Sequence, residues 1–249
     1  MIKIGIIGGS GLETTTIIQN PQHVEMETRY GQPSAAIMTG KISGIETVIL
    51  ARHGSNHQYS PTHVNNRANI MAMKELGVSH LIATTACGSL RQEIDRGHLV
   101  VLDQFIDFTR FRKNTFFDSF ESGAHHTAMA HPFDEKLREK LYAAAQALQL
   151  PVHARGCVVT IEGPRFSTVA ESKMFRLWGA DVINMSTAPE AMLANEAGIP
   201  YAAVAMSTDY DCWKEDESPV TWDEILMVFR KNADNVTGLL VKVIETFNQ

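Results

Sequence analysis

The sequence contains few cysteines, and none of them lie close together. Its 249 residues include only three, Cys87, Cys157 and Cys212, with no Cys-x-x-Cys pair among them. A disulfide framework or a zinc site would need closer or repeated cysteine spacing, so the sequence argues against both. Such cysteine usage is typical of a reducing compartment.

Basic runs and long apolar runs are also missing. The chain has 22 basic and 28 acidic side chains, a net charge of −6, and no cluster of Lys or Arg. This balance argues against nucleic acid as a partner. No stretch approaches the roughly 18 apolar residues of a membrane span. The apolar run at the N-terminus breaks into Gly8 and Gly9, too early for a signal peptide. We therefore expect a cytoplasmic protein without a membrane segment.

Short apolar runs alternate with amphipathic patterns along the chain, which favours an α/β domain whose strands are covered on both faces. The predicted strands span residues 2–7, 47–51, 80–84, 99–103, 156–161, 181–185 and 201–206. The predicted helices span residues 65–76, 133–148 and 167–178, the third capped by Ser167. A last, long helix opens with the capping-box spacing of Thr221 and Glu224. There is no repeat and no linker, so we expect residues 1–249 to form one domain.

One segment does not fit this alternation. Residues 111–130 are irregular, rich in aromatic residues and histidine, and too long for a simple connection. Long ordered loops of this kind usually serve a site or a subunit contact.

Several predicted strands end in small, polar or basic residues. The first strand leads into Gly8-Gly9-Ser10-Gly11, the second into Arg52-His53, and the third into Thr84-Thr85-Ala86-Cys87. The sixth strand ends in Asn184-Met185-Ser186. In open α/β sheets such ends surround one ligand site. A glycine-rich loop can hold a phosphate through its backbone N–H groups, and an arginine can bind the same anion.

The most informative strand end carries two aspartates. Asp209 and Asp211 follow the apolar run 201–206 at a spacing of i, i+2. Strand periodicity points both carboxyl groups to the same side. Two close carboxyl groups raise one another's pKa, so that one can hold a proton near neutrality. A plain polar loop after a strand is the alternative reading.

Familiar nucleotide-binding loops do not fit. In a Gly-x-Gly-x-x-Gly register that starts at Gly9, the last position is Thr14, and no Gly-Lys-Ser/Thr follows. Cys87 is more typical of a packed residue than of a nucleophile, because no matched base is evident. Together, the strand ends suit phosphate as a nucleophile, a ribose and a purine. This chemistry needs neither a metal cluster nor an activated serine or cysteine.

The motifs at these strand ends resemble those of the 5′-methylthioadenosine phosphorylases, a family within the trimeric purine nucleoside phosphorylase superfamily. The motifs occur in order along nearly the whole chain. They are Gly8-Gly9-Ser10-Gly11-Leu12, Ala51-Arg52-His53-Gly54, Thr84-Thr85-Ala86-Cys87-Gly88-Ser89-Leu90, residues 160–167, residues 179–185 and residues 208–215. The last two motifs are long and specific.

The resemblance implies a single α/β domain in which a mixed central sheet forms a distorted barrel flanked by helices. It also implies a homotrimer, or a dimer of trimers. The implied reaction is reversible phosphorolysis of 5′-methylthioadenosine to adenine and 5-methylthioribose 1-phosphate, in purine and methionine salvage. Inorganic phosphate is a co-substrate, and no cofactor or metal is implied.

The resemblance also assigns roles to individual residues. Asp209 and Asp211 match the catalytic pair that recognises the base. The phosphate-site positions are Ser10, Arg52, His53, Thr85, Ala86 and Ser186, where Ser10 and Ser186 stand in place of threonines. The ribose- and base-site positions are Met185, Phe166, Ser167 and Asn184. The positions near the 5′ substituent are His126, which reaches the neighbouring subunit, Trp222 and Ile225.

Several alternatives stay open. Trp222 replaces a small aliphatic residue of the family, and the given sequence stops at Gln249. The choice between a methylthio and a hydroxyl substituent is therefore open. The nearest rival is a purine nucleoside phosphorylase that acts on adenosine, inosine or guanosine, and methylthioinosine is disfavoured by the two aspartates. From other classes, an NAD(P)-dependent Rossmann enzyme lacks its third glycine, and a nucleoside-binding module leaves Arg52 unexplained.

Overall fold

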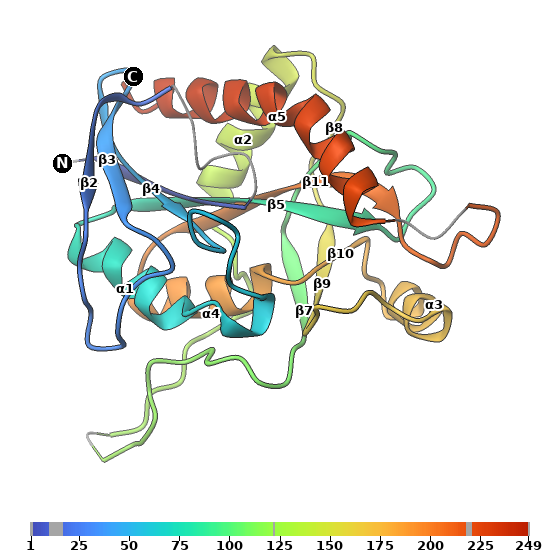
Figure 1. Cartoon of the computed structure of the whole chain (residues 1–249), viewed down its shortest axis with the longest axis horizontal. Helices are drawn as coiled ribbons and strands as arrows, with labels where there is room; N and C mark the ends of the chain where they lie inside the picture. The colour runs from blue at the N-terminus through green and yellow to red at the C-terminus, as the bar shows by residue number, and fades with distance from the viewer. Residues whose placement is uncertain (1, 10–16, 122, 218–220, 249) are drawn as a thin grey trace.

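The structure, a computed structural model, describes residues 2–9, 17–121, 123–217 and 221–248, apart from the side chains of residues 222, 226 and 231. Its strands are β1 (Lys3–Gly8), β2 (Gln19–Val24), β3 (Ile37–Ile42), β4 (Ile45–Ala51), β5 (His80–Ser89), β6 (Leu99–Val101), β7 (Gln104–Phe108), β8 (Val152–His153), β9 (Cys157–Ile161), β10 (Val182–Asn184) and β11 (Tyr201–Tyr210). Its helices are α1 (Asn66–Glu75), α2 (Glu135–Ala147), α3 (Val169–Leu177), α4 (Thr187–Ala197) and α5 (Trp222–Glu245), with a 3₁₀ turn, η1, at Pro61–His63. Figure 1 shows these elements in a single-domain α/β arrangement.

The 11 strands form one mixed sheet in which β5 is the branching strand. One side of the sheet runs in the order β2-β3-β4-β1-β5. On the other side, β5 pairs with both β11 and β10, and the pairing continues from β10 to β9 and β7 and from β11 to β6. Because β7 begins at Gln104, soon after β6 ends at Val101, these two arms meet. The mixed sheet flanked by helices agrees with the fold that the resemblance implies.

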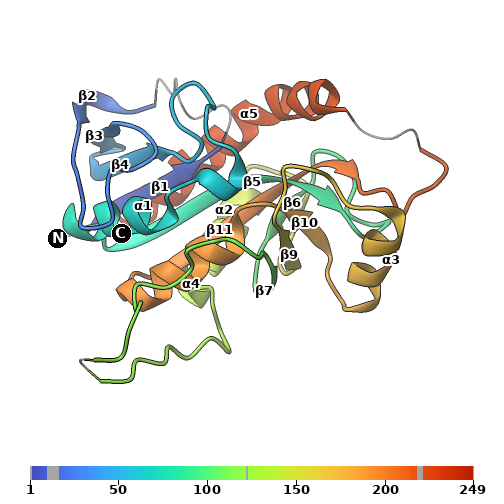
Figure 2. The ribbon, with the colours of Figure 1, turned by 60° about the horizontal axis from the view of Figure 1, so that its bottom comes forward.

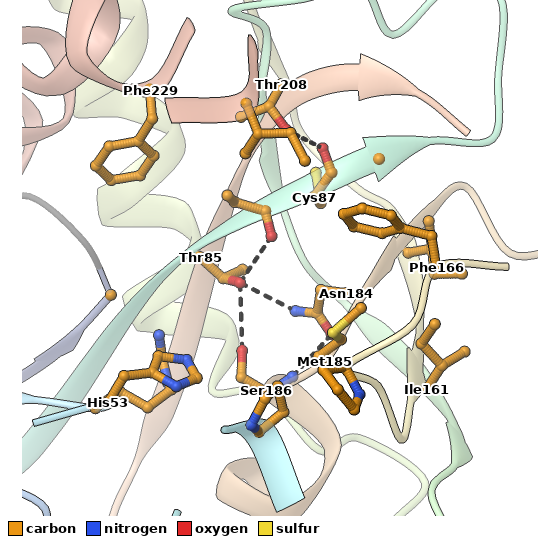
Figure 3. A pocket seen from close by; sticks show the side chains of 18 of the residues that line it. His53, Thr85, Cys87, Ile161, Phe166, Asn184, Met185, Ser186, Thr208 and Phe229 are labelled. Atoms are coloured by element: carbon orange, nitrogen blue, oxygen red, sulfur yellow. Dashed lines mark hydrogen bonds between the residues drawn. The ribbon is translucent and has the colours of Figure 1, made fainter. Parts of the chain in front are cut away.

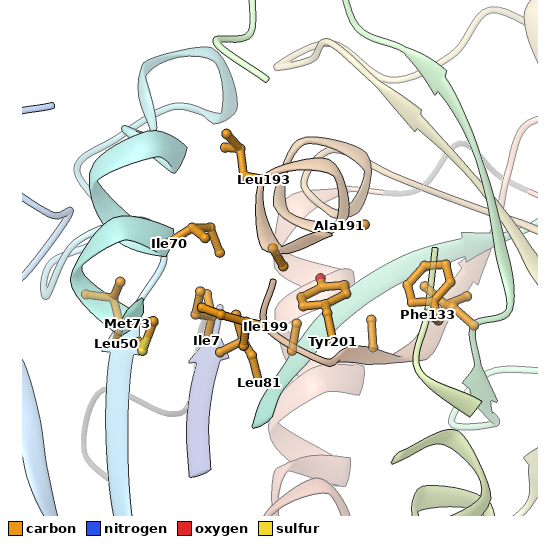
Figure 4. Close-up of a cluster of buried hydrophobic side chains, with 14 of the residues drawn as sticks. Ile7, Leu50, Ile70, Met73, Leu81, Phe133, Ala191, Leu193, Ile199 and Tyr201 are labelled. Atoms are coloured by element: carbon orange, nitrogen blue, oxygen red, sulfur yellow. The ribbon is translucent and has the colours of Figure 1, made fainter. Parts of the chain in front are cut away.

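Helices cover the two faces of this sheet with two separate apolar cores. On one face, α1 and α4 pack against each other and bury Ile70, Met73 and Leu193 with the strands beneath (Figures 2 and 4). On the other face, α2 and α5 bury Leu141 and Leu240. Strands that are covered on both sides carry apolar residues at every position, as the predicted runs did.

The predicted strands and helices are all present, but β5 and β11 extend further than expected. β5 continues to Ser89 and β11 to Tyr210, so Thr85 and Asp209 belong to strands rather than to the loops that follow them. The two strands run parallel over this length, with a register shift between Ser207 and Asp209. The residues predicted to follow the strands are therefore held by a hydrogen-bonded ladder.

Four strands and one helix were not predicted. The missed elements are β2, β3, β7, β8, α4 and the turn η1. β2 is almost fully exposed and contains Pro21, so it lacks the apolar run of a buried strand. α4 is buried on nearly all sides and therefore shows no amphipathic period.

The start of α3 differs from the prediction by one residue, whereas the long irregular segment agrees with it. The N-cap of α3 is Thr168 rather than Ser167, because the Thr168 hydroxyl accepts from the Glu171 N–H at 3.1 Å and completes a capping box. The described residues of the irregular segment 111–130 contain no helix or strand, as predicted, and this segment projects from the body of the molecule (Figure 2). No helix in the described part of the chain is long and apolar enough to cross a membrane.

Candidate active site

A cavity of about 600 Å³ opens where the carboxyl-terminal parts of β5, β10 and β11 come together (Figure 3). The predicted site residues that line it are Arg52, His53, Thr85, Ala86, Phe166, Ser167, Asn184, Met185, Ser186, Asp209, Asp211 and Ile225. These residues come from six segments that lie far apart in the sequence. The structure thus gathers the predicted strand ends around one space, while the role of each side chain stays a prediction.

Three predicted site residues are not placed in this cavity. Ser10 lies outside the described residues, although its neighbour Gly9 lines the cavity. Trp222 begins α5 as predicted, but its side chain is not described. His126 is exposed on the projecting loop, packs against Phe120, and does not line the cavity of its own chain.

Other lining residues were not assigned an individual role in the site, although Gly9 and Cys87 stand in predicted strand-end motifs. They are Gly9, His57, Gln58, Tyr59, Ser60, Pro61, Cys87, Gly88, Ile161, Pro164, Ile183, Thr208 and Phe229. Residues 57–61 come from the turn after β4, which carried no signal beyond its polar composition. Phe229 was visible only as an apolar position of the last helix.

The pairing of β5 with β11 positions Asp209. Asp209 lies opposite Gly88 in the ladder. A Cβ atom on Gly88 would lie 3.3 Å from Asp209 Oδ2 and 3.1 Å from Ile183 Cγ2, closer than ordinary contacts. The absence of a side chain at residue 88 therefore leaves the space that the Asp209 carboxyl group occupies.

Asp209 is the carboxyl group best suited to hold a proton. It is 6% exposed, and burial together with the nearby Asp211 raises its pKa to about 6, against the effect of a hydrogen bond from Thr208. The Thr208 hydroxyl lies 2.7 Å from Asp209 Oδ1 and 3.2 Å from the carbonyl oxygen of Cys87. A neutral carboxyl group can donate a hydrogen bond that a carboxylate cannot.

Asp211 lies beside it with an unsatisfied oxygen. Burial raises the pKa of Asp211 as well, against the effect of the neighbouring Ser172 and Ser167 hydroxyl groups. Its Oδ2 is buried without a well-formed hydrogen bond from the described residues. An unsatisfied buried acceptor is costly, and a ligand that donates a hydrogen bond would remove that cost.

The opposite end of the cavity is basic and rich in hydroxyl groups. Arg52 lines the cavity there while only 2% exposed. The hydroxyl groups of Thr85 and Ser186 lie 3.3 Å apart. Asn184 donates to Thr85 Oγ1 at 3.3 Å and to Thr187 Oγ1 at 2.6 Å, so both of its amide hydrogens are used within the protein. Asn184 therefore fixes the hydroxyl groups around it.

His53 is neutral in this environment. Burial and the adjacent Arg52 lower its pKa to about 4. Its Nδ1 lies 2.9 Å from the carbonyl oxygen of Tyr59, and a carbonyl can only accept, so Nδ1 carries the hydrogen. Nε2 is therefore an acceptor.

The wall between the two ends is largely apolar. Met185 packs tightly on Gly163, since a Cβ atom on Gly163 would lie 2.4 Å from the Met185 sulfur atom. Phe166 lines this wall and is 45% exposed. Ile225 and Phe229 add apolar surface from α5, where each is nearly buried.

Glu162, at the end of β9, ties the rim of this cavity to the projecting loop. Its carboxylate accepts from Thr62 in η1, from the backbone N–H groups of Arg110 and Phe111, and from the Arg112 guanidinium. Although burial alone would raise the pKa of Glu162, these hydrogen bonds lower it to about 2. The carboxylate is thus a permanent anchor for both segments.

The described residues offer little else for catalysis. No group of three or more His, Cys, Asp or Glu side chains in this part of the chain could hold a metal ion. Burial, reinforced by Asp209, raises the pKa of the Cys87 thiol well above its usual value. A thiol in that state is a poor nucleophile, in line with its interpretation as a packed residue.

The fold and the cavity agree with a comparison to known families. A sequence profile of the Phosphorylase superfamily matches residues 3–245. The chain therefore belongs to the Phosphorylase superfamily.

Individual relatives are more specific. An S-methyl-5′-thioadenosine phosphorylase from Xenopus tropicalis is 51% identical over 247 residues, which cover 98% of this chain and 88% of the relative. The structure of a methylthioadenosine phosphorylase from Schistosoma mansoni, in complex with adenine, superposes with a TM-score of 0.94 at 39% identity and covers 100% of this chain and 92% of that one. A mutant adenosine/methylthioadenosine phosphorylase from Schistosoma mansoni, in complex with methylthioadenosine, has a TM-score of 0.93 at 38% identity, with the same coverage.

The environment of Asp209 makes a prediction about its titration. We expect its carboxyl group to titrate near pH 6 in ¹³C NMR of the aspartate-labelled protein. Asp211→Asn removes a like charge and should lower this pKa, whereas Thr208→Val removes a hydrogen bond to the carboxylate and should raise it. Shifts in the same direction for both variants would contradict this account of the site.

Proposed function

We propose that the chain catalyses the reversible phosphorolysis of 5′-methylthioadenosine to adenine and 5-methylthioribose 1-phosphate. The observation that carries this proposal is the polarity of one cavity, with a protonatable Asp209 at one end and the buried cation Arg52 at the other. A purine nucleoside with a phosphate beside its ribose fits this order. The identity of about half of the residues to a methylthioadenosine phosphorylase supports the same substrate.

The phosphate end supplies the nucleophile. Arg52 and the hydroxyl groups of Thr85 and Ser186 are suited to hold a phosphate ion. Cleavage of the bond between C1′ and the purine nitrogen develops positive charge on the sugar. A phosphate oxygen held nearby stabilises that charge and then forms the new bond to C1′. Met185, on the apolar wall, suits the ribose between the two ends.

The aspartate end activates the leaving group. The electron pair of the broken bond passes to the purine, and protonated Asp209 donates its proton to N7. The proton that phosphate loses on becoming an ester, exchanged through solvent, restores Asp209. The chemistry therefore needs no cofactor, because phosphate is a co-substrate and the protein supplies the acid. Such general acid catalysis typically contributes about 10²–10⁴-fold in rate.

Base selectivity follows from the same carboxyl groups. The 6-amino group of adenine can donate to the unsatisfied Oδ2 of Asp211 or to the second oxygen of Asp209. A 6-oxopurine would present an acceptor to these acceptors, which costs an unpaired buried group. The nearly buried Ile225 and Phe229 support an apolar 5′ substituent. Adenosine is the second candidate, because one structural relative is named for both nucleosides.

The projecting loop supports a trimer. Phe111 is 74% exposed and Phe120 51% exposed, and His126 lies away from the cavity of its own chain. Exposed aromatic residues on a long loop are typical of a contact surface. We propose that His126 completes the cavity of a neighbouring subunit in a homotrimer. We also propose the cytoplasm as the compartment, which the three free cysteines support.

The first test is the reaction itself. We expect release of adenine from methylthioadenosine only when phosphate is present, with adenosine used more slowly and inosine hardly at all. Competition between the three nucleosides, followed by chromatography of the nucleosides that remain, gives the order. Inosine turnover equal to that of methylthioadenosine would contradict the proposed substrate, and base release without phosphate would contradict the proposed reaction.

A second test addresses Asp209. Asp209→Asn cannot donate a proton, so kcat/KM for methylthioadenosine should fall by about 10²–10⁴-fold. Its amide N–H can donate to the 6-oxo group, so relative use of inosine should rise. Asp216→Asn, at an exposed position of the following loop, is the matched control and should leave both rates unchanged. An unchanged preference for adenine in Asp209→Asn would remove this residue from base recognition.

A third test addresses the trimer. His126→Ala should raise the KM for methylthioadenosine by about tenfold, the value of one lost contact of roughly 1.4 kcal/mol, while the KM for phosphate stays constant. Co-expression of His126→Ala with Asp209→Asn should recover normal KM in mixed oligomers, since the intact Asp209 and the intact His126 then meet. His23→Ala, on the exposed strand β2, is the control. A monomer by light scattering, or no recovery in the mixture, would contradict the shared site.

A further inference from the structure

Arg52 is surrounded by acceptors that belong to the protein. Its Nε donates to Glu190 Oε1, and its Nη2 donates to Glu190 Oε2 at 3.1 Å and to the carbonyl oxygen of Ile7 at 3.4 Å. Its Nη1 donates to the carbonyl oxygen of Thr84 at 3.0 Å. Four of the five N–H groups of the guanidinium are thus used, and one on Nη1 has no acceptor among the described residues.

The acid that holds Arg52 lies behind the cavity wall rather than in it. Glu190 is in the first turn of α4, is 0% exposed, and does not line the cavity. Its Oε2 also accepts from the hydroxyl group of Tyr201 at 3.1 Å. Tyr201 is 1% exposed at the start of β11, where its ring packs beside α4 and Phe133 (Figure 4). The three side chains form a chain of contacts that leads from the core to the cavity.

A buried cation at a substrate site presents a physical problem. The guanidinium must stay in the cavity wall when no phosphate is bound, and an unpaired charge in that position is costly. A second anion that never leaves resolves this problem. Two parallel hydrogen bonds to one carboxylate also fix the plane of the guanidinium, which a single contact would not.

We propose that Glu190, braced by Tyr201, is a positioning residue that keeps the Arg52 guanidinium oriented between reaction cycles and leaves one N–H group for phosphate. This inference rests on the proposed function, in which Arg52 binds phosphate. Neither Glu190 nor Tyr201 lines the cavity. Phosphate affinity therefore depends on two residues outside the cavity wall.

The electrostatics are consistent with this arrangement. Burial opposes the charge on Arg52, but the attraction and hydrogen bonds of Glu190 outweigh it and raise the pKa of Arg52. Burial and the adjacent Glu190 carboxylate raise the pKa of the Tyr201 hydroxyl well above its usual value. Tyr201 is thus a hydrogen-bond donor to Glu190 throughout the physiological pH range.

The test uses the mildest change in this chain of contacts. Tyr201→Phe removes one hydroxyl group and keeps the ring that packs against Phe133. We expect the KM for phosphate to rise about three- to tenfold, the range expected for one hydrogen bond, with the KM for methylthioadenosine unchanged. Glu190→Asp, whose shorter side chain cannot reach both nitrogens, should raise the phosphate KM further. Tyr142→Phe is the matched control, because it removes a hydroxyl group whose only hydrogen-bond partner among the described residues is Gln146.

A double-mutant cycle separates positioning from a structural role. If Tyr201 acts through Arg52, adding Tyr201→Phe to Arg52→Lys should change the phosphate KM by less than twofold, since coupled residues are not additive. Additive effects would overturn the proposal. Equal loss of phosphate and nucleoside affinity in Tyr201→Phe would also overturn it, because that result indicates a general loss of structure.

A binding measurement keeps this proposal distinct from the proposed function. Inorganic phosphate should raise the melting temperature of the wild-type protein, and this rise should be smaller for Tyr201→Phe at the same phosphate concentration. If phosphate raises the melting temperature of the wild type more than that of Tyr201→Phe, but the wild type releases no base, the proposed reaction fails and the positioning role stands. An equal rise in both proteins would overturn the positioning role whatever the reaction.

Discussion

The parallel pairing of β5 with β11 is the constraint on which the rest of the site depends. The carbonyl oxygen of Thr84 in β5 holds Arg52, and Gly88 near the end of the same strand leaves space for Asp209 in β11. Both ends of the cavity are therefore built on one hydrogen-bonded ladder. The register shift between Ser207 and Asp209 occurs within this ladder, where the strand passes from the core to the cavity. Extra twist at such an irregularity is a common means of aiming a side chain.

Environment sorts the titratable groups of the cavity into different states. Arg52 stays charged because a guanidinium is strongly basic and is paired here with Glu190, whereas His53 is neutral because burial and Arg52 both oppose its protonation. Asp209 is poised to exchange a proton because burial and Asp211 raise its pKa into the physiological range. Groups whose surroundings separate their pKa values in this way can divide acid and anion-binding roles in one small space. The acid end and the anion-binding end of the cavity thus differ because their side chains lie in different surroundings.

The sequence predicted the buried strands and about half of the cavity wall, because apolar runs and the polar residues that follow them are strong local signals. Apolar runs that end in Arg52, Thr85 and Asp209 are such signals. It did not predict α4, which is buried on nearly all sides and so has no polar face, and Glu190 was missed with it. It did not predict β2, an exposed edge strand without an apolar run. A side-chain contact such as that between Tyr201 and Glu190 depends on how chain segments pack in the fold, and residue spacing alone does not predict it.

The shared anchor at Glu162 links two regions that seem unrelated along the chain. One carboxylate holds the cavity rim through Thr62 and the base of the projecting loop through the backbone of Arg110 and Phe111. A displacement of either segment must stretch hydrogen bonds to the same two oxygen atoms. The rim and the base of the loop are therefore coupled through the Glu162 carboxylate. Whatever fixes the outer end of the loop also stiffens the entrance to the cavity of its own chain.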